Sequence, residues 1–448
     1  MRDWSDLDKK YLWHPFTQME EWLHSEVLVI DSGDGNYVVD TDGKRYLDGV
    51  SSLWVNIHGH RKKKIDDAIK RQLDKVAHST LLGLASTSSI ELAEKLIQVT
   101  PGNLTKVFYS DSGSTAVEVG MKIAFQYWRN LGHEEKRLFI TLSDAYHGDT
   151  IGSVSLGGID LFHSIFHPLL FKTLTIPSPF PYRYPDLTED ECKQMSLEHL
   201  ERLVSERGHE IAAMVMEPLV QGAAGMIVHP KGFLQEVWNI CRTNDILLVC
   251  DEVATGFGRT GKMFAIEHED VEPDILCLAK GLSGGYLPLA ATLVSDKIFS
   301  AFLGKYTDYK TFFHGHSYTG NALACAAACA SLDIFEQEQL LEHLPQKIEH
   351  FRHKLNSEMA ALPWVADIRQ CGLMVGIELV EDQETRKAFP EELRVGVKVI
   401  QDIRKAGVIL RPLGDVLVMM PPLSITLEEI SYLVGASAQS INNVCGKS

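Results

Sequence analysis

Short apolar runs rich in β-forming residues recur through the middle of this 448-residue chain. Most are separated by stretches with the 3.6-residue periodicity of amphipathic helices, such as 114–130 and 234–243. Strands that alternate with helices favour a mostly parallel sheet covered on both faces, because each parallel connection needs a crossover. The sequence therefore predicts an α/β fold whose large domain contains seven strands, at 106–110, 137–142, 172–176, 211–216, 246–251, 275–279 and 289–294.

The two ends of the chain have different patterns. The C-terminal third combines an Ala-rich helix near 321–335, a polar helix, a strand pair at 366–370 and 374–380, and further short strands and helices. This mixture predicts a smaller α+β domain. The first residues, with the turn Asp40-Thr-Asp-Gly43, predict a hairpin-bearing arm that packs on it. We expect an N-terminal arm over 1–60, a large domain over 61–330 and a small domain over 331–448.

Charge and composition exclude several classes of protein. The formal net charge is −17, and Arg61-Lys-Lys-Lys64 is the densest basic patch. Nucleic acid is therefore not an expected partner, because phosphate binding needs clustered positive charge. No run of about 20 apolar residues is present and the N-terminus is polar, so we expect neither a membrane span nor a secretory signal. The eight cysteines form no Cys-x-x-Cys pair, and we expect no metal site and a cytoplasmic location.

A carboxylate and a lysine stand at the ends of two neighbouring apolar runs. Asp251 closes the run that begins at Ile246, and Lys280 follows the run that begins at Ile275. The separation is about one strand–crossover–strand unit, so both side chains can lie at the same edge of a parallel sheet. There a desolvated lysine can form a Schiff base with the aldehyde of pyridoxal phosphate, and the aspartate can keep the ring nitrogen protonated. We therefore predict pyridoxal phosphate as the cofactor.

Three further segments have residue types that suit such a cofactor and its substrate. Gly113 and Ser114 begin a predicted helix with small residues, which exposes backbone N–H groups to a phosphate. Tyr146 follows a strand and can stack on a flat ring. Arg411 ends a short C-terminal strand, where a guanidinium can bind a carboxylate. Each also has an ordinary explanation, respectively a helix cap, a core aromatic and a surface ion pair.

The stretch Gly256-Phe-Gly258-Arg259-Thr-Gly261 matches the Gly-x-Gly-x-x-Gly pattern of dinucleotide sites and so leaves a nicotinamide oxidoreductase as an alternative. A true fingerprint opens directly into a helix and has an acidic residue about 20 positions later. Here residues 262–265 are a poor start for a helix. This alternative is disfavoured.

Several motifs in order resemble the class III aminotransferases, which are fold-type I pyridoxal phosphate enzymes. They are Asp111-Ser-Gly-Ser114, Tyr146-His-Gly-Asp149, Glu217-Pro-Leu-Val-Gln-Gly222, Asp251-Glu-Val-Ala-Thr-Gly-Phe-Gly-Arg-Thr-Gly261, Lys280 and His314-Gly-His-Ser-Tyr-Thr-Gly-Asn321. Within the class, Leu12-Trp-His-Pro15, Ser51-Ser-Leu-Trp54 and Arg411-Pro412 resemble the diaminopelargonic acid aminotransferases of biotin biosynthesis. Such enzymes convert 8-amino-7-oxononanoate to 7,8-diaminononanoate.

The resemblance implies roles for individual residues. Lys280 would hold the cofactor and move the proton, Asp251 would face the ring nitrogen, and Tyr146 would lie beside the ring and the substrate. Gly113 and Ser114 would bind the phosphate, with Gly315, His316 and Ser317 contributed by the second subunit of a homodimer. Arg411 would bind the substrate carboxylate, and Trp54 would form a wall beside its alkyl chain.

The chain departs from the family at two positions of the expected amino-donor pocket. Phe16 stands where a tyrosine is common, and Leu53 stands where a second tryptophan is common. A phenol hydroxyl and an indole are thereby lost, so the donor is either S-adenosylmethionine or a smaller amine such as lysine. The alternatives within the class are an ornithine or another ω-amino acid aminotransferase, and a non-catalytic relative is disfavoured because Lys280 and Asp251 occur together.

Overall fold

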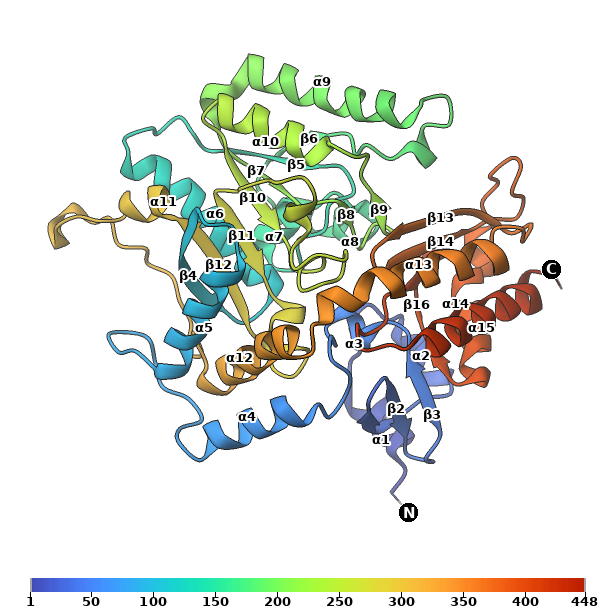
Figure 1. Cartoon of the computed structure of the whole chain (residues 1–448). Helices are drawn as coiled ribbons and strands as arrows, with labels where there is room; N and C mark the ends of the chain where they lie inside the picture. The colour runs from blue at the N-terminus through green and yellow to red at the C-terminus, as the bar shows by residue number, and fades with distance from the viewer. Residues whose placement is uncertain (1, 447–448) are drawn as a thin grey trace.

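The computed structural model describes residues 2–446 and has a seven-stranded sheet at its centre (Figure 1). The strand order is β4-β12-β11-β10-β7-β5-β6. The strands are β4 (Leu104–Ser110), β5 (Leu138–Leu142), β6 (Leu174–Ile176), β7 (Ile211–Met216), β10 (Leu247–Asp251), β11 (Ile275–Leu278) and β12 (Ala290–Ser295). β12 runs antiparallel to both of its neighbours, and the other pairs are parallel. The prediction of a mostly parallel sheet of seven strands is confirmed.

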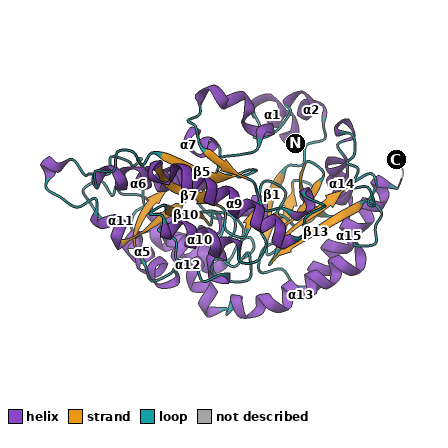
Figure 2. Cartoon of the chain, turned by 90° about the horizontal axis from the view of Figure 1, so that it is seen from above, coloured by secondary structure: helices purple, strands orange, loops and turns teal. Residues whose placement is uncertain are grey.

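Helices cover both faces of this sheet (Figure 2). Val249 of β10 packs in one buried cluster with helix α6 (Gly113–Asn130), whereas its neighbours Leu248 and Cys250 pack in another with α10 (Phe233–Thr243). Successive residues of a strand point to opposite faces, which is why these strands are apolar throughout. The other α-helices between residues 61 and 337 are α4 (Lys63–Leu73), α5 (Thr87–Val99), α7 (Ile151–Ser155), α8 (Asp160–His163), α9 (Glu189–Arg207), α11 (Asp296–Ser300) and α12 (Ala322–Gln337).

The chain ends form two four-stranded sheets beside the central one. The first has the order β1-β2-β3-β15 and the second the order β13-β14-β17-β16. Their strands are β1 (Ile30–Asp34), β2 (Tyr37–Asp40), β3 (Arg45–Asp48), β13 (Val365–Cys371), β14 (Met374–Leu379), β15 (Val408–Ile409), β16 (Arg411–Leu413) and β17 (Val416–Met419). Because β15 pairs in parallel with β3, the N-terminal hairpin and the C-terminal region share one sheet. The domain boundaries near 60 and 330 stay a prediction.

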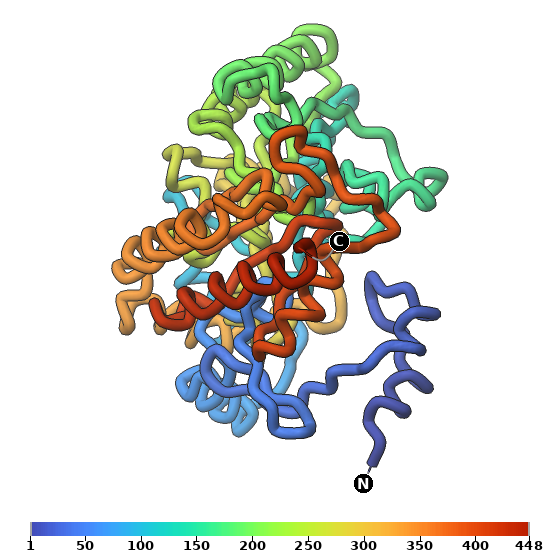
Figure 3. The backbone as a smooth tube through the Cα atoms, turned by 90° about the vertical axis from the view of Figure 1, so that its right-hand side faces the viewer, coloured from blue at the N-terminus to red at the C-terminus, as the bar shows by residue number. Residues whose placement is uncertain are grey.

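Helices flank these sheets. They are α1 (Trp4–Tyr11), α2 (Met19–His24), α3 (Ser51–Trp54), α13 (Leu340–Glu358), α14 (Val395–Ile403) and α15 (Leu427–Cys445), and a small hairpin joins β8 (Val220–Gln221) to β9 (Ile227–Val228). Figure 3 shows the N-terminal segment that contains α1 and α2, in dark blue, at the edge of the molecule. Within residues 2–446, no helix is both long enough and apolar enough to span a membrane.

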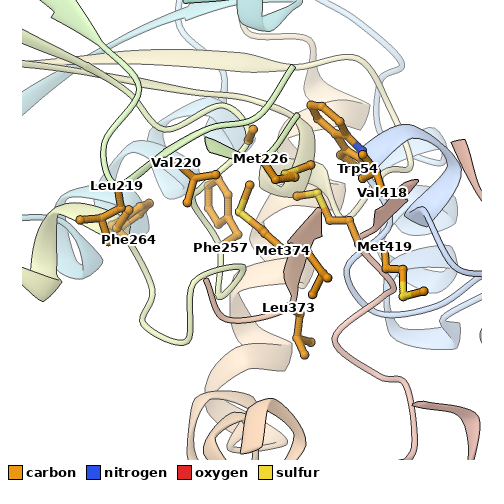
Figure 4. Packing of buried hydrophobic residues seen from close by; sticks show 14 of the residues in the cluster. Trp54, Leu219, Val220, Met226, Phe257, Phe264, Leu373, Met374, Val418 and Met419 are labelled. Atoms are coloured by element: carbon orange, nitrogen blue, oxygen red, sulfur yellow. The ribbon is translucent and has the colours of Figure 1, made fainter. Parts of the chain in front are cut away.

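One core joins the three parts of the chain (Figure 4). It contains Phe257 and Met226 from the central region, Met374 and Val418 from the C-terminal sheet, and Trp54 from the N-terminal region. These side chains are all nearly excluded from solvent. The position of Trp54 therefore depends on how the ends of the chain pack against the central sheet.

We expect Leu417→Ala, in β17 of this core, to lower the free energy of unfolding by about 2–5 kcal/mol, because the side chain is fully buried and its loss leaves a cavity. Leu161→Ala is the matched control, because Leu161 is 82% exposed. The melting temperatures of both variants are measured by thermal unfolding. Equal melting temperatures for the two would contradict this account of the core.

Candidate active site

The carboxyl ends of β10 and β11 place the two residues of the predicted cofactor site in one cavity of about 690 Å³. Asp251 is the last residue of β10 and pairs with Cys277 of the parallel strand β11. Lys280 follows β11 in a 3₁₀ turn over Lys280–Ser283. Both side chains line the cavity, together with Trp54, Gly113, Ser114 and Tyr146.

The Lys280 amine lies in surroundings that favour its neutral form. Burial lowers the pKa of Lys280, although the negative charges of Asp251 and Glu217 oppose this effect. Its Nζ lies 4.7 Å from the centroid of the Trp54 ring. Only a neutral amine is nucleophilic, so the site prepares Lys280 for attack on a carbonyl carbon.

Asp251 is held by a buried histidine to which the sequence pattern alone assigns no role. His147 Nδ1 lies 2.7 Å from Asp251 Oδ2, and the Val253 backbone N–H donates to Oδ1 at 3.0 Å. Burial alone would lower the pKa of His147, but the hydrogen bond and the charge of Asp251 raise it above its ordinary value. The two contacts fix the orientation of the Asp251 carboxyl at the edge of the sheet.

Glu217 is a second residue that sequence analysis used only as part of a motif. Its Oε1 accepts the Tyr146 backbone N–H at 3.2 Å, and its Oε2 accepts that of Gly222 at 2.9 Å. Burial raises the pKa of Glu217 to about 7, and nearby Asp251 contributes to the rise. This carboxyl therefore connects two loops of the cavity and lies beside two of its charged groups. The position of Glu217 directly after the apolar run 211–216 is the sequence signal that could have identified this residue.

The phosphate-binding prediction falls on the N-terminus of α6. The first N–H groups of a helix have no partner inside it, and here they belong to residues that line the cavity. The backbone is closely packed there, because a Cβ on Gly113 would lie 2.5 Å from Val253 Cγ1. Ser114 Oγ is 2.7 Å from Thr150 Oγ1, so its hydroxyl already has a neighbour in the next loop.

Tyr146 lies between the cavity and an outer group of aromatic rings. Its hydroxyl donates to Asp149 Oδ2 at 2.8 Å, and its ring is 6.3 Å from that of Phe162. Phe162 contacts Phe16 at 5.4 Å, and the Arg411 guanidinium lies 5.9 Å from the Phe16 ring. Phe16 and Arg411 therefore lie outside Tyr146 and do not line the cavity itself.

The remaining predicted residues lie elsewhere in this chain. Gly315, His316 and Ser317 belong to the segment before α12 and are absent from the cavity wall. His78 Nε2 is 2.6 Å from the Ser317 carbonyl oxygen, which fixes the segment against the loop before α5. Their expected contribution to a second subunit's site stays a prediction.

The glycine-rich stretch that suggested a dinucleotide site has a structural role. Arg259 is 1% exposed and donates to the carbonyl oxygens of Pro421 at 2.6 Å and Asn56 at 2.9 Å. No α-helix begins at this stretch in the described chain. The arginine ties the N-terminal and C-terminal regions to the central one.

Together these residues fit pyridoxal phosphate. Lys280 can bind its aldehyde, Asp251 its ring nitrogen and the α6 N-terminus its phosphate, and all three line the same cavity. His147 Nε2 and Trp54 Nε1 are buried without a hydrogen-bond partner in residues 2–446. Polar atoms left unpaired next to a cavity are typical of a ligand site. Within the same residues, no group of three or more His, Cys, Asp or Glu side chains could hold a metal ion.

Comparison with known proteins agrees with this geometry. The family model "Aminotransferase class-III" matches residues 19–441. An adenosylmethionine-8-amino-7-oxononanoate aminotransferase of Nitratidesulfovibrio vulgaris is 58% identical over 96% of this chain and 79% of its own. The enzyme of the same name from Geobacter sulfurreducens is 52% identical over 100% of this chain and 98% of its own.

Solved structures give the same result. The crystal structure of the Methanocaldococcus jannaschii adenosylmethionine-8-amino-7-oxononanoate aminotransferase is 45% identical, covers 98% of both chains and superposes with a TM-score of 0.94. An ω-transaminase of Pseudomonas jessenii in complex with PMP is 31% identical over 100% of this chain and 99% of its own, with a TM-score of 0.95. The chain belongs to the class III aminotransferases, which use pyridoxal phosphate.

Proposed function

We propose that this chain catalyses the transamination of 8-amino-7-oxononanoate to 7,8-diaminononanoate in biotin biosynthesis. The observation that carries the proposal is the single cavity in which Lys280 and Asp251 meet, in a chain 58% and 52% identical to aminotransferases of that name. Ornithine and other ω-amino acid aminotransferases share the class, but the ω-transaminase of Pseudomonas jessenii is only 31% identical, against 58% and 52% for the two oxononanoate aminotransferases. The expected cytoplasmic location stays a prediction.

In the proposed mechanism each residue of the site has a separate role. When bound, pyridoxal phosphate supplies an electron-withdrawing ring that stabilises negative charge on the carbon that loses its proton. The Lys280 amine would hold the cofactor through Nζ and, when free, would carry the proton taken from the donor carbon. Asp251, which His147 orients, would hold the cofactor at its ring nitrogen. The ketone substrate uses the same residues in the reverse order.

Trp54, Tyr146 and Arg411 would bind the substrate. Trp54 and Tyr146 line the cavity and offer apolar surface to an alkyl chain. Arg411 lies in the outer aromatic group near Tyr146, where a cation can bind the carboxylate of the oxononanoate. The arrangement suits a substrate with a reactive ketone at one end and a charge at the other.

We propose S-adenosylmethionine as the amino donor. The two departures that left the donor open fall on side chains outside the cavity, since Phe16 is 56% exposed and Leu53 is 48% exposed. The substitutions at these two positions therefore change the outside of the cavity more than the surroundings of Lys280. The donor in the names of the relatives supports this choice.

We also propose that the enzyme is a homodimer in which Gly315, His316 and Ser317 complete the partner's site. Large apolar side chains are exposed on the two segments that His78 joins, among them Leu82 at 90% and Phe313 at 76%. Exposed apolar side chains of this size are typical of surfaces covered by another protein.

Lys280→Ala should abolish turnover, because no other lysine among residues 2–446 lines the cavity. Borohydride reduction of the native enzyme followed by peptide mapping should label Lys280, and the variant should remain unlabelled. Lys280→Arg is the control for charge, since it keeps a cation but cannot form the covalent bond. Labelling of a different lysine would contradict the proposed site.

With 8-amino-7-oxononanoate as acceptor, we expect product formation with S-adenosylmethionine and little or none with lysine. The measurement is the amount of 7,8-diaminononanoate formed at equal donor concentrations. A clear preference for lysine would reverse the donor assignment and leave the acceptor assignment intact. Failure with both donors, in enzyme shown to hold cofactor, would remove the proposed function.

The free energy of unfolding of the Glu217→Gln variant should rise relative to that of the native chain as the pH increases. The pKa of Glu217 is raised to about 7 in the folded protein, so the unfolded chain releases this proton at lower pH than the folded chain does. Native stability is therefore lost between about pH 4.5 and pH 7, by at most about 3 kcal/mol, and the loss is constant above that range. Thermal unfolding of both proteins across this range measures the gap, and a gap that does not grow with pH would contradict the assignment.

A further inference from the structure

Four consecutive residues beside the cavity have left-handed backbone conformations although none is glycine. The φ angles are 51° at Ser51, 49° at Ser52, 77° at Leu53 and 70° at Trp54. Residues with a Cβ avoid this region, and runs of them are rare because the Cβ crowds the following carbonyl oxygen. Such a turn persists only where its surroundings hold it, and it is typical of functional sites.

A buried carboxylate outside the cavity holds this turn. Asp48 is 2% exposed, and its Oδ1 accepts the Ser52 backbone N–H at 2.8 Å. Its Oδ2 accepts the Ser52 hydroxyl at 2.7 Å and lies 3.0 Å from His60 Nε2. Ser52 thus makes two hydrogen bonds to one side chain, and they fix the second residue of the turn.

The neighbouring residues are anchored as well. The Ser51 hydroxyl donates to the Met420 carbonyl oxygen at 2.7 Å, just after β17. Beyond the turn, Arg259 donates to the Asn56 carbonyl oxygen at 2.9 Å. The loop after Lys280 is also close, since a Cβ on Gly285 would lie 2.9 Å from the Val55 carbonyl carbon. The turn therefore connects the C-terminal sheet to the Lys280 loop.

The turn ends on the side chain that covers the reacting amine. Trp54 lines the cavity, and its ring centroid is 4.7 Å from Lys280 Nζ. Its indole Nε1 is buried and lacks a hydrogen-bond partner in the described chain. A right-handed or extended backbone at residues 51–54 would direct this indole elsewhere. Asp48 itself is not part of the cavity wall, so any effect it has on substrate must act through the turn.

We propose that Asp48 is a positioning residue whose carboxylate holds the left-handed turn over Ser51–Trp54 and so fixes the Trp54 wall of the substrate site. The proposal rests on the proposed function, because Trp54 is taken to contact the alkyl chain of the oxononanoate. Asp48 would then affect substrate specificity although its side chain does not line the cavity.

The test uses Asp48→Asn, which keeps the size of the side chain but turns one acceptor oxygen into a donor that faces Ser52 or His60. We expect the half-reaction with 8-amino-7-oxononanoate to lose on the order of tenfold in kcat/KM, mainly through a higher KM, because the wall of its binding site is displaced. The half-reaction with the amino donor should lose clearly less, because only the oxononanoate is taken to pack its alkyl chain on Trp54. A general structural defect would lower both half-reactions alike.

Two substitutions at Leu53 form a matched pair for a rescue experiment. Leu53→Gly and Leu53→Ala both remove the exposed side chain, but only glycine lacks the Cβ that opposes a left-handed backbone. In the Asp48→Asn background, Leu53→Gly should restore most of the lost kcat/KM, and Leu53→Ala should not. In the cofactor-free protein with Asp48→Asn, Leu53→Gly should also give a higher melting temperature than Leu53→Ala.

The outcomes separate the two proposals. Equal losses in both half-reactions, or identical behaviour of the glycine and alanine variants, would overturn the role of Asp48. If the native enzyme does not aminate 8-amino-7-oxononanoate, the proposed function fails, and the melting temperatures still decide whether Asp48 holds the turn. If Asp48→Asn does not fold, Ser52→Ala removes a single hydrogen bond of the same cluster and is assayed with the same Leu53 pair.

Discussion

The removal of the Lys280 amine from water is the constraint on which the rest of the site depends. A charged ammonium in a poorly hydrated cavity is unfavourable, so burial pushes the amine toward its neutral form. Asp251 and Glu217 act in the opposite direction and keep the proton within reach. The balance gives a lysine that can serve both as nucleophile and as proton carrier, and the neighbouring residues maintain this balance. His147 Nδ1 lies 2.7 Å from Asp251 Oδ2 and so holds that carboxyl in place beside the lysine.

Maintaining such a site requires unfavourable features elsewhere. Each residue with a Cβ in a left-handed conformation costs about 1–2 kcal/mol, and the segment before the cavity contains four of them. Glu217 is held in a place where burial raises its pKa to about 7. The buried apolar core that joins all three parts of the chain offsets these costs, and Trp54 belongs to it (Figure 4). The packing of the chain ends therefore helps to place Trp54 in the wall of the cavity.

The fold was predictable from the sequence where the signal is local. The seven apolar runs became the seven strands of the sheet because a strand buried on both faces is apolar throughout. Asp251 and Lys280 could be placed together because they end adjacent strands of one such unit. The pairing of β3 with β15 could not be predicted, since it joins residues distant in the sequence and β15 has only two residues.

The site residues that sequence analysis missed share a physical cause: their roles depend on contacts between distant segments. His147 acts through Asp251, which is 104 positions away, and Arg259 resembled part of a nucleotide motif until its buried carbonyl partners were seen. The left-handed turn has no glycine to announce it, and the hydrogen bond of Ser51 to Met420 joins segments 369 positions apart. Residues that touch a cofactor directly follow strand ends and helix starts, which a sequence reveals. Residues that position them follow the packing of the whole chain, so their identification needs the three-dimensional structure.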